Sequence, residues 1–214
     1  MKSSLLQSFV GKISLVVGLL MISSTAFAQV TYTDSVCAGS QDVVYGITGA
    51  ATTSNYTWWL SDPTAGTIDT SVSANNSTIE IDWGTVVGTY TLSAVETTNN
   101  GCIGDTVTLN IVINPLPTVA IVADSVCEGF NASLTFTLTG TAPWTINYTD
   151  GTTNFSATAT ASPHVVSLPA YTTSQTITVT GLTDDNGCAA DPAGLPSTNV
   201  TIFQGATTGP IFHY

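Results

Sequence analysis

The residue types that most often carry out chemistry in proteins are sparse in this sequence. It has two basic residues, Lys2 and Lys12, and two histidines, His164 and His213, against 14 acidic residues. Because both lysines lie close to the N-terminus, the rest of the chain has no cationic side chain to hold a phosphate, form a Schiff base or follow a nucleic-acid backbone. These functions are therefore excluded for most of the chain.

The remaining nucleophiles and acids do not form a catalytic motif. His164 follows Ser162-Pro163 in an expected loop, and no serine carries the elbow motif of hydrolases. Glu80, Glu96 and Glu128 could supply a carboxylate pair for glycoside cleavage, but each is better explained as a solvent-facing strand or turn residue. We therefore expect no catalytic residue, no cofactor and no enzymatic activity.

One acidic cluster has a composition that suits calcium. Asp184-Asp185-Asn186-Gly187 resembles a fragment of a calcium loop, but it lacks the spaced ligands and the closing Glu of an EF-hand. The residue types also favour a hairpin turn, since Asp, Asn and Gly tolerate a positive φ. Asn99-Asn100-Gly101 takes the same place earlier in the chain without acidic residues. We interpret the cluster as a turn and expect no metal site, with calcium binding left open.

The N-terminus has the pattern of a signal peptide over residues 1–28. Met1-Lys2 begins a charged region, Ile13 to Ile22 is apolar, and Ala26-Phe27-Ala28 has the form that signal peptidase recognises. The apolar run is shorter than the roughly 20 residues that span a bilayer. We expect an exported protein that is extracellular or at the cell surface, with the periplasm as an alternative, and that is not an integral membrane protein.

The four cysteines lie in an internal repeat. Asp34-Ser35-Val36-Cys37 recurs as Asp124-Ser125-Val126-Cys127, and Asn100-Gly101-Cys102 recurs as Asn186-Gly187-Cys188. Each copy thus has one early and one late cysteine. An even cysteine count in an exported chain indicates disulfides, and four cysteines allow three pairings. The repeat predicts Cys37–Cys102 and Cys127–Cys188, each worth roughly 4 kcal/mol by the entropy of the closed loop.

Between the cysteines, apolar residues alternate with polar ones in Thr- and Val-rich runs separated by Gly, Asn and Asp. This pattern is typical of half-buried antiparallel strands, and about seven short strands in ninety residues suit an immunoglobulin-like sandwich. Two prolines in Asn114-Pro115-Leu116-Pro117 indicate a short, stiff linker. We therefore predict an all-β protein of two tandem antiparallel sandwiches, residues 29–114 and 115–204, each with one disulfide, followed by a tail at 205–214.

The first copy contains several distinctive motifs, which are Tyr56-Thr57-Trp58, Gly66-Thr67-Ile68, Ile79-Glu80-Ile81-Asp82-Trp83-Gly84, Gly88-Thr89-Tyr90-Thr91-Leu92, Asn100-Gly101-Cys102 and the Asn114–Pro117 linker. Together they resemble the PKD-like, immunoglobulin-fold domains repeated in surface and gliding-motility-associated proteins of the Bacteroidota. The second copy keeps the cysteines but has no counterpart of Ile81-Asp82-Trp83-Gly84. The resemblance implies an extracellular role in adhesion, matrix or filament-like display, with the domains as spacers or binding modules. No C-terminal sorting domain of the type IX pathway is recognisable.

Two surfaces are candidate contacts with a partner. Trp59 follows the inward-facing Trp58 in a strand, so it should lie on the outer face, where it could stack on a sugar, pack under a loop or meet another subunit. Ile211, Phe212 and Tyr214 form an apolar end that could fray or add a strand to a neighbouring sheet.

The Asp-Ser and Asp-Thr dipeptides that end at Ser35, Thr106 and Ser125 are similar to the O-glycosylation acceptor of Bacteroidota, although the same pattern also begins ordinary strands.

We predict a structural, adhesive or assembly subunit of a cell-surface or extracellular protein assembly. A carbohydrate-binding module is the alternative.

Overall fold

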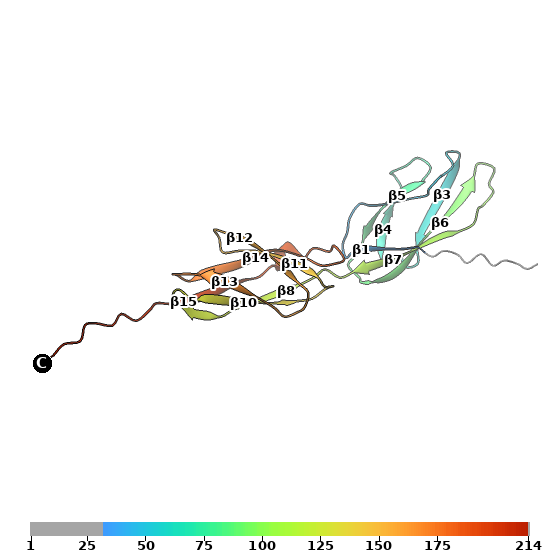
Figure 1. The fold of residues 1–214 in the computed structure, drawn as a ribbon. Helices are drawn as coiled ribbons and strands as arrows, with labels where there is room; N and C mark the ends of the chain where they lie inside the picture. Colours follow the sequence, from blue (N-terminus) through green and yellow to red (C-terminus); the bar gives the residue numbers. More distant parts are fainter. Residues whose placement is uncertain (1–31, 214) are drawn as a thin grey trace, which may run out of the picture. The chain divides into compact units, whose positions relative to one another are not determined.

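The computed structural model of the chain describes residues 32–213, and the predicted signal peptide and Tyr214 lie outside these residues. The first half of the described chain forms two sheets. One has the strand order β1-β7-β6-β3 and the other the order β2-β5-β4 (Figure 1). The strands are β1 (Tyr32–Cys37), β2 (Val43–Gly46), β3 (Ser54–Leu60), β4 (Gly66–Asp69), β5 (Thr78–Trp83), β6 (Gly88–Thr98) and β7 (Val107–Asn114).

These two sheets enclose one hydrophobic core, and we call them together the first sandwich. Ile79, Ile81 and Trp83 alternate along β5 and are almost completely buried, and they face Leu92 of β6 and Ile111 of β7. The alternation arises because successive side chains of a strand point to opposite faces. The rings of Tyr45 and Trp83 pack edge to face, with their centroids 6.1 Å apart.

The second half forms another pair of sheets around a separate core, which we call the second sandwich. Their strand orders are β13-β10-β8 and β12-β11-β14-β15-β9 (Figure 1). The strands are β8 (Val119–Ala123), β9 (Ser125–Cys127), β10 (Asn131–Leu138), β11 (Trp144–Thr149), β12 (Asn154–Ala159), β13 (His164–Ala170), β14 (Gln175–Thr183) and β15 (Ser197–Phe203), with one turn of 3₁₀-helix, η1 (Pro192–Gly194), before the last strand.

The prediction of an all-β protein is confirmed, because residues 32–213 contain no α-helix. In the same part of the chain no helix is long and apolar enough to cross a membrane. Trp83 and Trp144 belong to the hydrophobic cores, since they are 1% and 6% exposed. The domain boundary at Asn114 stays a prediction.

The two sandwiches differ in the path of their first strand. In the second, β8 pairs antiparallel with β10, and the chain then switches to pair β9 parallel with β15. In the first, β1 pairs parallel with β7 along its whole length, from Tyr32 opposite Leu109 to Cys37 opposite Asn114. The first sandwich therefore has no counterpart of β8 among the described residues.

In the hairpin between β11 and β12, the carboxylate of Asp150 takes the place of a backbone carbonyl as a hydrogen-bond acceptor. The Asp150 Oδ1 atom accepts hydrogen bonds from the N–H groups of Thr152 and Thr153 at 2.9 and 2.7 Å, and Oδ2 accepts one from the Tyr171 hydroxyl at 3.0 Å. These donors, led by the Thr153 N–H, lower the pKa of Asp150 to about 2.

We expect the hairpin to lose stability in acid through Asp150. Its pKa lies below the value of about 3.9 in an unfolded chain, so its contribution is present above that pH and is lost as pH falls through about 2. Asn at this position keeps one acceptor oxygen but removes the charge. The denaturation midpoint of Asp150→Asn should therefore lie below that of the wild type at pH 7, and the two should converge between pH 4 and 2. A constant difference over this range would contradict the assignment.

Candidate functional site

The disulfide in the structure joins the two halves of the chain rather than the two cysteines of one half. Cys37 is bonded to Cys188 with their Cα atoms 5.5 Å apart, and Cys102 and Cys127 are free and exposed. The predicted pairings Cys37–Cys102 and Cys127–Cys188 are therefore wrong. Cys37–Cys188 is the one disulfide among residues 32–213, and it belongs to neither sandwich alone.

The reason is the direction of the strands in the first sandwich. Cys37 ends β1 opposite Asn114, which is the last residue of β7, whereas Cys102 lies in the hairpin before Val107, the first residue of β7. Seven residue steps of a strand separate these levels by about 23 Å. A disulfide needs Cα atoms within about 7 Å, so the two cysteines cannot meet.

The second sandwich repeats this arrangement. Cys127 lies opposite Phe203 at the end of β15, and Cys188 precedes Ser197, where β15 begins. The six steps of β15 alone span about 20 Å. Each sandwich thus has its early cysteine at the end where the chain leaves and its late cysteine at the other end. The linker from Asn114 leaves the first sandwich beside Cys37.

The most distinctive surface of the first sandwich is the free edge of β2. This strand pairs with β5 on one side, and no described strand pairs with its other side. An apolar groove of about 350 Å³ lies along this edge, between the two sheets. Its lining combines Tyr45 of β2 with Leu92 and Ala94 of β6 and Val107 and Leu109 of β7.

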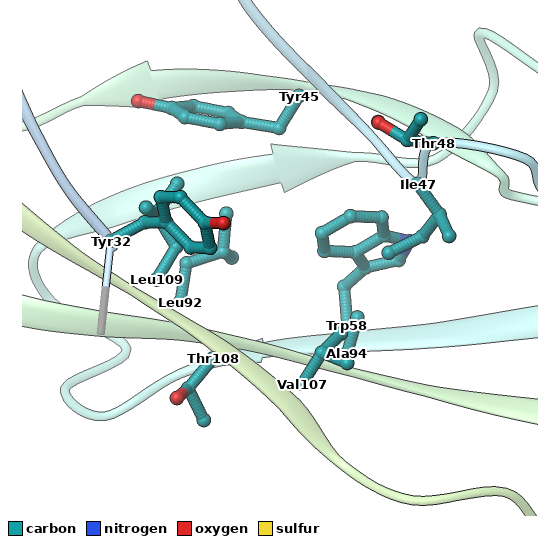
Figure 2. A pocket seen from close by; sticks show the side chains of 11 residues that line it. Tyr32, Tyr45, Ile47, Thr48, Trp58, Leu92, Ala94, Val107, Thr108 and Leu109 are labelled. Atoms are coloured by element: carbon teal, nitrogen blue, oxygen red, sulfur yellow. The ribbon is translucent and has the colours of Figure 1, made fainter. Parts of the chain in front are cut away.

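Figure 2 shows the aromatic rings of Tyr32, Tyr45 and Trp58 around this groove. The Trp58 Nε1–H donates a hydrogen bond to the carbonyl of Asn76 at 2.7 Å, and the Tyr45 hydroxyl donates to Asp34 at 3.4 Å. Burial, together with the charge of Asp34, raises the pKa of Tyr45 to about 12. Tyr45 therefore stays neutral at any physiological pH, and the groove offers apolar walls with neutral polar groups.

The second sandwich shows what kind of segment covers such a groove. There β8 lies along β10, and alternate side chains, Val119, Ile121 and Ala123, pack against the core. The repeat places β10 of the second sandwich in the position of β2 in the first. The groove is thus the place that an added extended strand would fill.

The structure confirms the predicted facing of β3. Tyr56 and Leu60 are buried, whereas Trp59 is 41% exposed on the outer face. Ile211 and Phe212 are also exposed and belong to no strand, and Tyr214 lies outside the described residues. The groove and Trp59 come from different faces, because Trp58 lines the groove and its neighbour points away from it. The role of Trp59 and of the tail as contacts stays a prediction.

The other predicted positions are not brought together into one site. Ser35, Thr106 and Ser125 are all exposed, and their glycosylation stays a prediction. The Asp184 carboxylate accepts hydrogen bonds from the N–H groups of Thr141, Asn186 and Cys188 at 3.0–3.1 Å, as expected for a turn. Within residues 32–213 no three His, Cys, Asp or Glu side chains lie close enough to hold a metal ion.

Sequence reasoning missed the groove. The available signal was that the repeat-equivalent of Val119–Ala123 is residues 29–33, which begin at the predicted cleavage site. Comparing these two segments indicates that a strand equivalent to β8 would begin at the first residues of the predicted mature chain.

Comparison with known proteins gives no family for this chain. No protein-family model matches it, and no curated protein matches it in sequence. Among solved structures, the fibronectin(III)-like modules of Clostridium thermocellum CbhA are 18% identical, with 87% of this chain and 98% of that chain covered and a TM-score of 0.42. The D00–D0 domain of intimin is 15% identical, with 81% and 96% covered and a TM-score of 0.37. These scores are too low to support an inference.

We expect two of the four cysteines to react with an alkylating agent in the native protein. Cys102 and Cys127 should be labelled, because they are exposed and free, and Cys37 and Cys188 should be labelled only after reduction. Peptide mapping under non-reducing conditions needs chymotrypsin or Glu-C, since the chain has no Lys or Arg after Lys12. A peptide that joins Cys37 to Cys102 would contradict the structure.

Proposed function

We propose that this chain is a non-enzymatic exported protein that acts as a structural, adhesive or assembly subunit at the cell surface. We further propose that it assembles by taking up an extended segment of a partner along β2. The observation that carries the proposal is the free edge of β2 with its apolar groove, in the position that β8 covers in the second sandwich. The disulfide between the halves also supports export, since disulfides persist in oxidising compartments.

Strand addition suits this edge physically. The incoming backbone gains hydrogen bonds from the edge strand, and alternate side chains enter the groove and provide selectivity. Exposed edges are commonly protected by charges, prolines or bulges. The edge of β2 carries none of these among Val43–Gly46, and Val44 on this strand is 59% exposed.

The C-terminal segment of a second copy has the properties of the occupant. Ile211 and Phe212 are 100% and 74% exposed, and residues 204–214 contain no Asp, Glu, Lys or Arg. The segment begins after Phe203, the last residue of β15, just as the linker begins after Asn114, the last residue of β7. Four residues separate Asn114 from Val119 in the linker, and seven separate Phe203 from Ile211. The tail is therefore long enough to begin a strand on a neighbouring sandwich.

We expect a labelled peptide of residues 205–214 to bind the mature chain truncated after Gly205. The Val107→Asp substitution places a charge at the lip of the groove and should weaken binding about tenfold or more, or roughly 1.4 kcal/mol. Val122→Asp is the matched control, because Val122 is also exposed on a strand but belongs to the second sandwich. Fluorescence anisotropy measures both.

Three outcomes distinguish the occupants of the groove. Loss of binding on changing Ile211 and Phe212 to Ser in the peptide would support docking by their side chains. Equal weakening by Val107→Asp and Val122→Asp would show a non-specific charge effect and would contradict the site. Binding that appears only after residues 29–31 are removed would show that the chain fills its own groove.

Trp59 favours a second candidate, a carbohydrate-binding module. Its ring is 41% exposed on the outer face of β3, and an exposed aromatic face can stack on a sugar ring. A glycan array with the wild type and Trp59→Ala tests this candidate. We expect sugar binding to be lost in the variant with a stability change within about 0.5 kcal/mol, as for other surface substitutions. If the wild type binds no glycan, this candidate is excluded.

A further inference from the structure

The two free cysteines are the repeat-equivalents of the two bonded ones. Cys127 corresponds to Cys37 in the Asp-Ser-Val-Cys motif, and Cys102 corresponds to Cys188 in the Asn-Gly-Cys motif. The bond within the chain therefore joins an early cysteine of one sandwich to a late cysteine of the other. One early and one late cysteine remain free, and both are exposed.

The backbone around each early cysteine is the same. After Cys37 and after Cys127, the next residue donates its N–H to the last residue of the neighbouring strand, at 2.8 and 2.9 Å. In both turns the cysteine carbonyl accepts a hydrogen bond of 3.1 Å from the N–H of the third residue after it. The following glycines, Gly39 and Gly129, have φ values of 78° and 83°. Cys127 is thus held in the conformation in which Cys37 forms a disulfide.

The late cysteines match equally well. The N–H of Cys102 donates to the Thr98 side chain at 3.1 Å, and that of Cys188 donates to the Asp184 side chain at 3.0 Å. Their carbonyls accept the N–H of the same two residues at 2.9 and 3.1 Å. The backbone around each free cysteine therefore has the conformation found around the equivalent cysteine of the disulfide.

Three residues beside the free cysteines are large and apolar where their repeat-equivalents at the bonded pair are small or polar. Glu128 is the exception, because it follows Cys127 where Ala38 follows Cys37. Phe130 and Phe203, beside Cys127, are 66% and 56% exposed, and Ile103, next to Cys102, is 76% exposed. The repeat-equivalent residues at the bonded joint are Ser40, Asn114 and Ala189, in that order. A joint with a covalent linker can be polar, whereas a joint between separate molecules needs apolar contact to hold the partners together. Phe130, Phe203 and Ile103 would supply such contact, since they are large, apolar and exposed beside the free cysteines.

We propose that copies of this protein join head to tail through a disulfide between Cys127 of one copy and Cys102 of the next. The joint repeats between molecules the early-to-late pairing of Cys37 with Cys188. Each bond leaves one early cysteine free at one end and one late cysteine free at the other. The contact is heterologous, because the two copies contribute different cysteines, and its repetition joins further copies in the same direction.

The chemistry is a two-step thiol–disulfide exchange. The Cys127 thiolate attacks one sulfur of an oxidant disulfide, either a protein or glutathione disulfide, and releases one thiol of the oxidant. The Cys102 thiolate of the second copy then attacks the Cys127 sulfur and releases the second thiol of the oxidant. One disulfide forms between the copies, the oxidant disulfide is reduced, and the two protons of the protein thiols pass to the oxidant.

Complementary single variants of the full mature chain test this pairing. Wild-type protein incubated with glutathione disulfide should give a ladder of multiples on a non-reducing gel, which collapses to monomer on reduction. Cys102→Ser and Cys127→Ser should each stay monomeric alone, since each lacks one half of the joint. Mixing the two variants should give a dimer and nothing larger. Mapping of a ¹⁴N and ¹⁵N mixture should find Cys102–Cys127 peptides of mixed isotope.

Several results would overturn the proposal. Single variants that dimerise alone as readily as the mixture would show unselective oxidation. Cys102–Cys127 peptides found only in isotopically pure form, with none of mixed isotope, would show a bond within one copy. A mixture that stays monomeric would also exclude the joint. Retention of the Cys37–Cys188 peptide in each variant shows that the fold is intact.

A matched substitution tests the apolar contact at the joint. Phe130→Ser recreates at the free end the residue found at the bonded joint, and it should slow ladder formation several-fold. Val165→Ser, which removes an apolar side chain that is 59% exposed on β13, opposite Thr135 of β10, should not. Equal rates in Phe130→Ser and the wild type would show that apolar contact does not guide the bond.

This inference rests on the proposed role as an assembly subunit, but it can fail separately. Protein truncated after Gly205 lacks the proposed strand donor and keeps both free cysteines. If the truncated protein still forms the ladder but no longer attaches to the surface assembly, the two proposals act independently. If the wild type forms no ladder while full-length double variants without Cys102 and Cys127 attach normally, the disulfide joint is excluded and strand addition stands.

Discussion

Parallel pairing between the first and last strands of each sandwich determines how the rest of the molecule is connected. β1 pairs with β7 and β9 pairs with β15, in both cases in the same direction. A parallel pair places the end of the first strand beside the end of the last, where the chain leaves the sandwich. The early cysteine therefore lies at the exit, and the late cysteine, which precedes the last strand, lies at the entrance. Only an exit and an entrance of different sandwiches can be bonded.

The two sandwiches differ at one edge because the chain crosses to this parallel pairing at different points. In the second, the chain stays on β10 until Asp124, whose carboxylate accepts the Ser133 N–H at 2.7 Å, and then crosses to β15. In the first, Tyr32 to Asp34 already lie on β7, and Asp34 accepts a hydrogen bond from Tyr45 instead. The residues that could cover β2 are thus used elsewhere. A small difference in where the chain crosses produces a free edge, and a free edge is a surface for strand pairing.

The composition limits how such a protein can interact. After Lys12 the chain has no basic residue, and charged residues are only 7% of the whole. Residues 32–213 contain no Lys or Arg, so this part of one copy cannot form a Lys or Arg ion pair with the same part of another. The remaining interactions are backbone hydrogen bonds, apolar contact and disulfides. The free edge of β2, the exposed Phe130 and Phe203, and the free cysteines supply these three kinds.

The sequence by itself determined the secondary structure and its facing. Period-two alternation identifies a strand because side chains alternate across its two faces. It therefore predicts Trp58 inward and Trp59 outward, and Trp59 is 41% exposed. The repeat of the cysteine motifs indicated two copies of one unit. These features are local, since each depends on residues within a few positions of one another.

Only the tertiary structure decided which cysteines meet and where the free edge lies. The cysteine motifs show which positions are equivalent, but not whether a first strand runs parallel or antiparallel to the last. That direction moves Cys37 by the length of β7, and it changes its partner from Cys102 to Cys188. The groove depends likewise on whether residues near Tyr32 pair with β2 or with β7, although both pairings suit the same alternating sequence. Long-range strand pairing decides between them, because the competing partners are tens of residues apart.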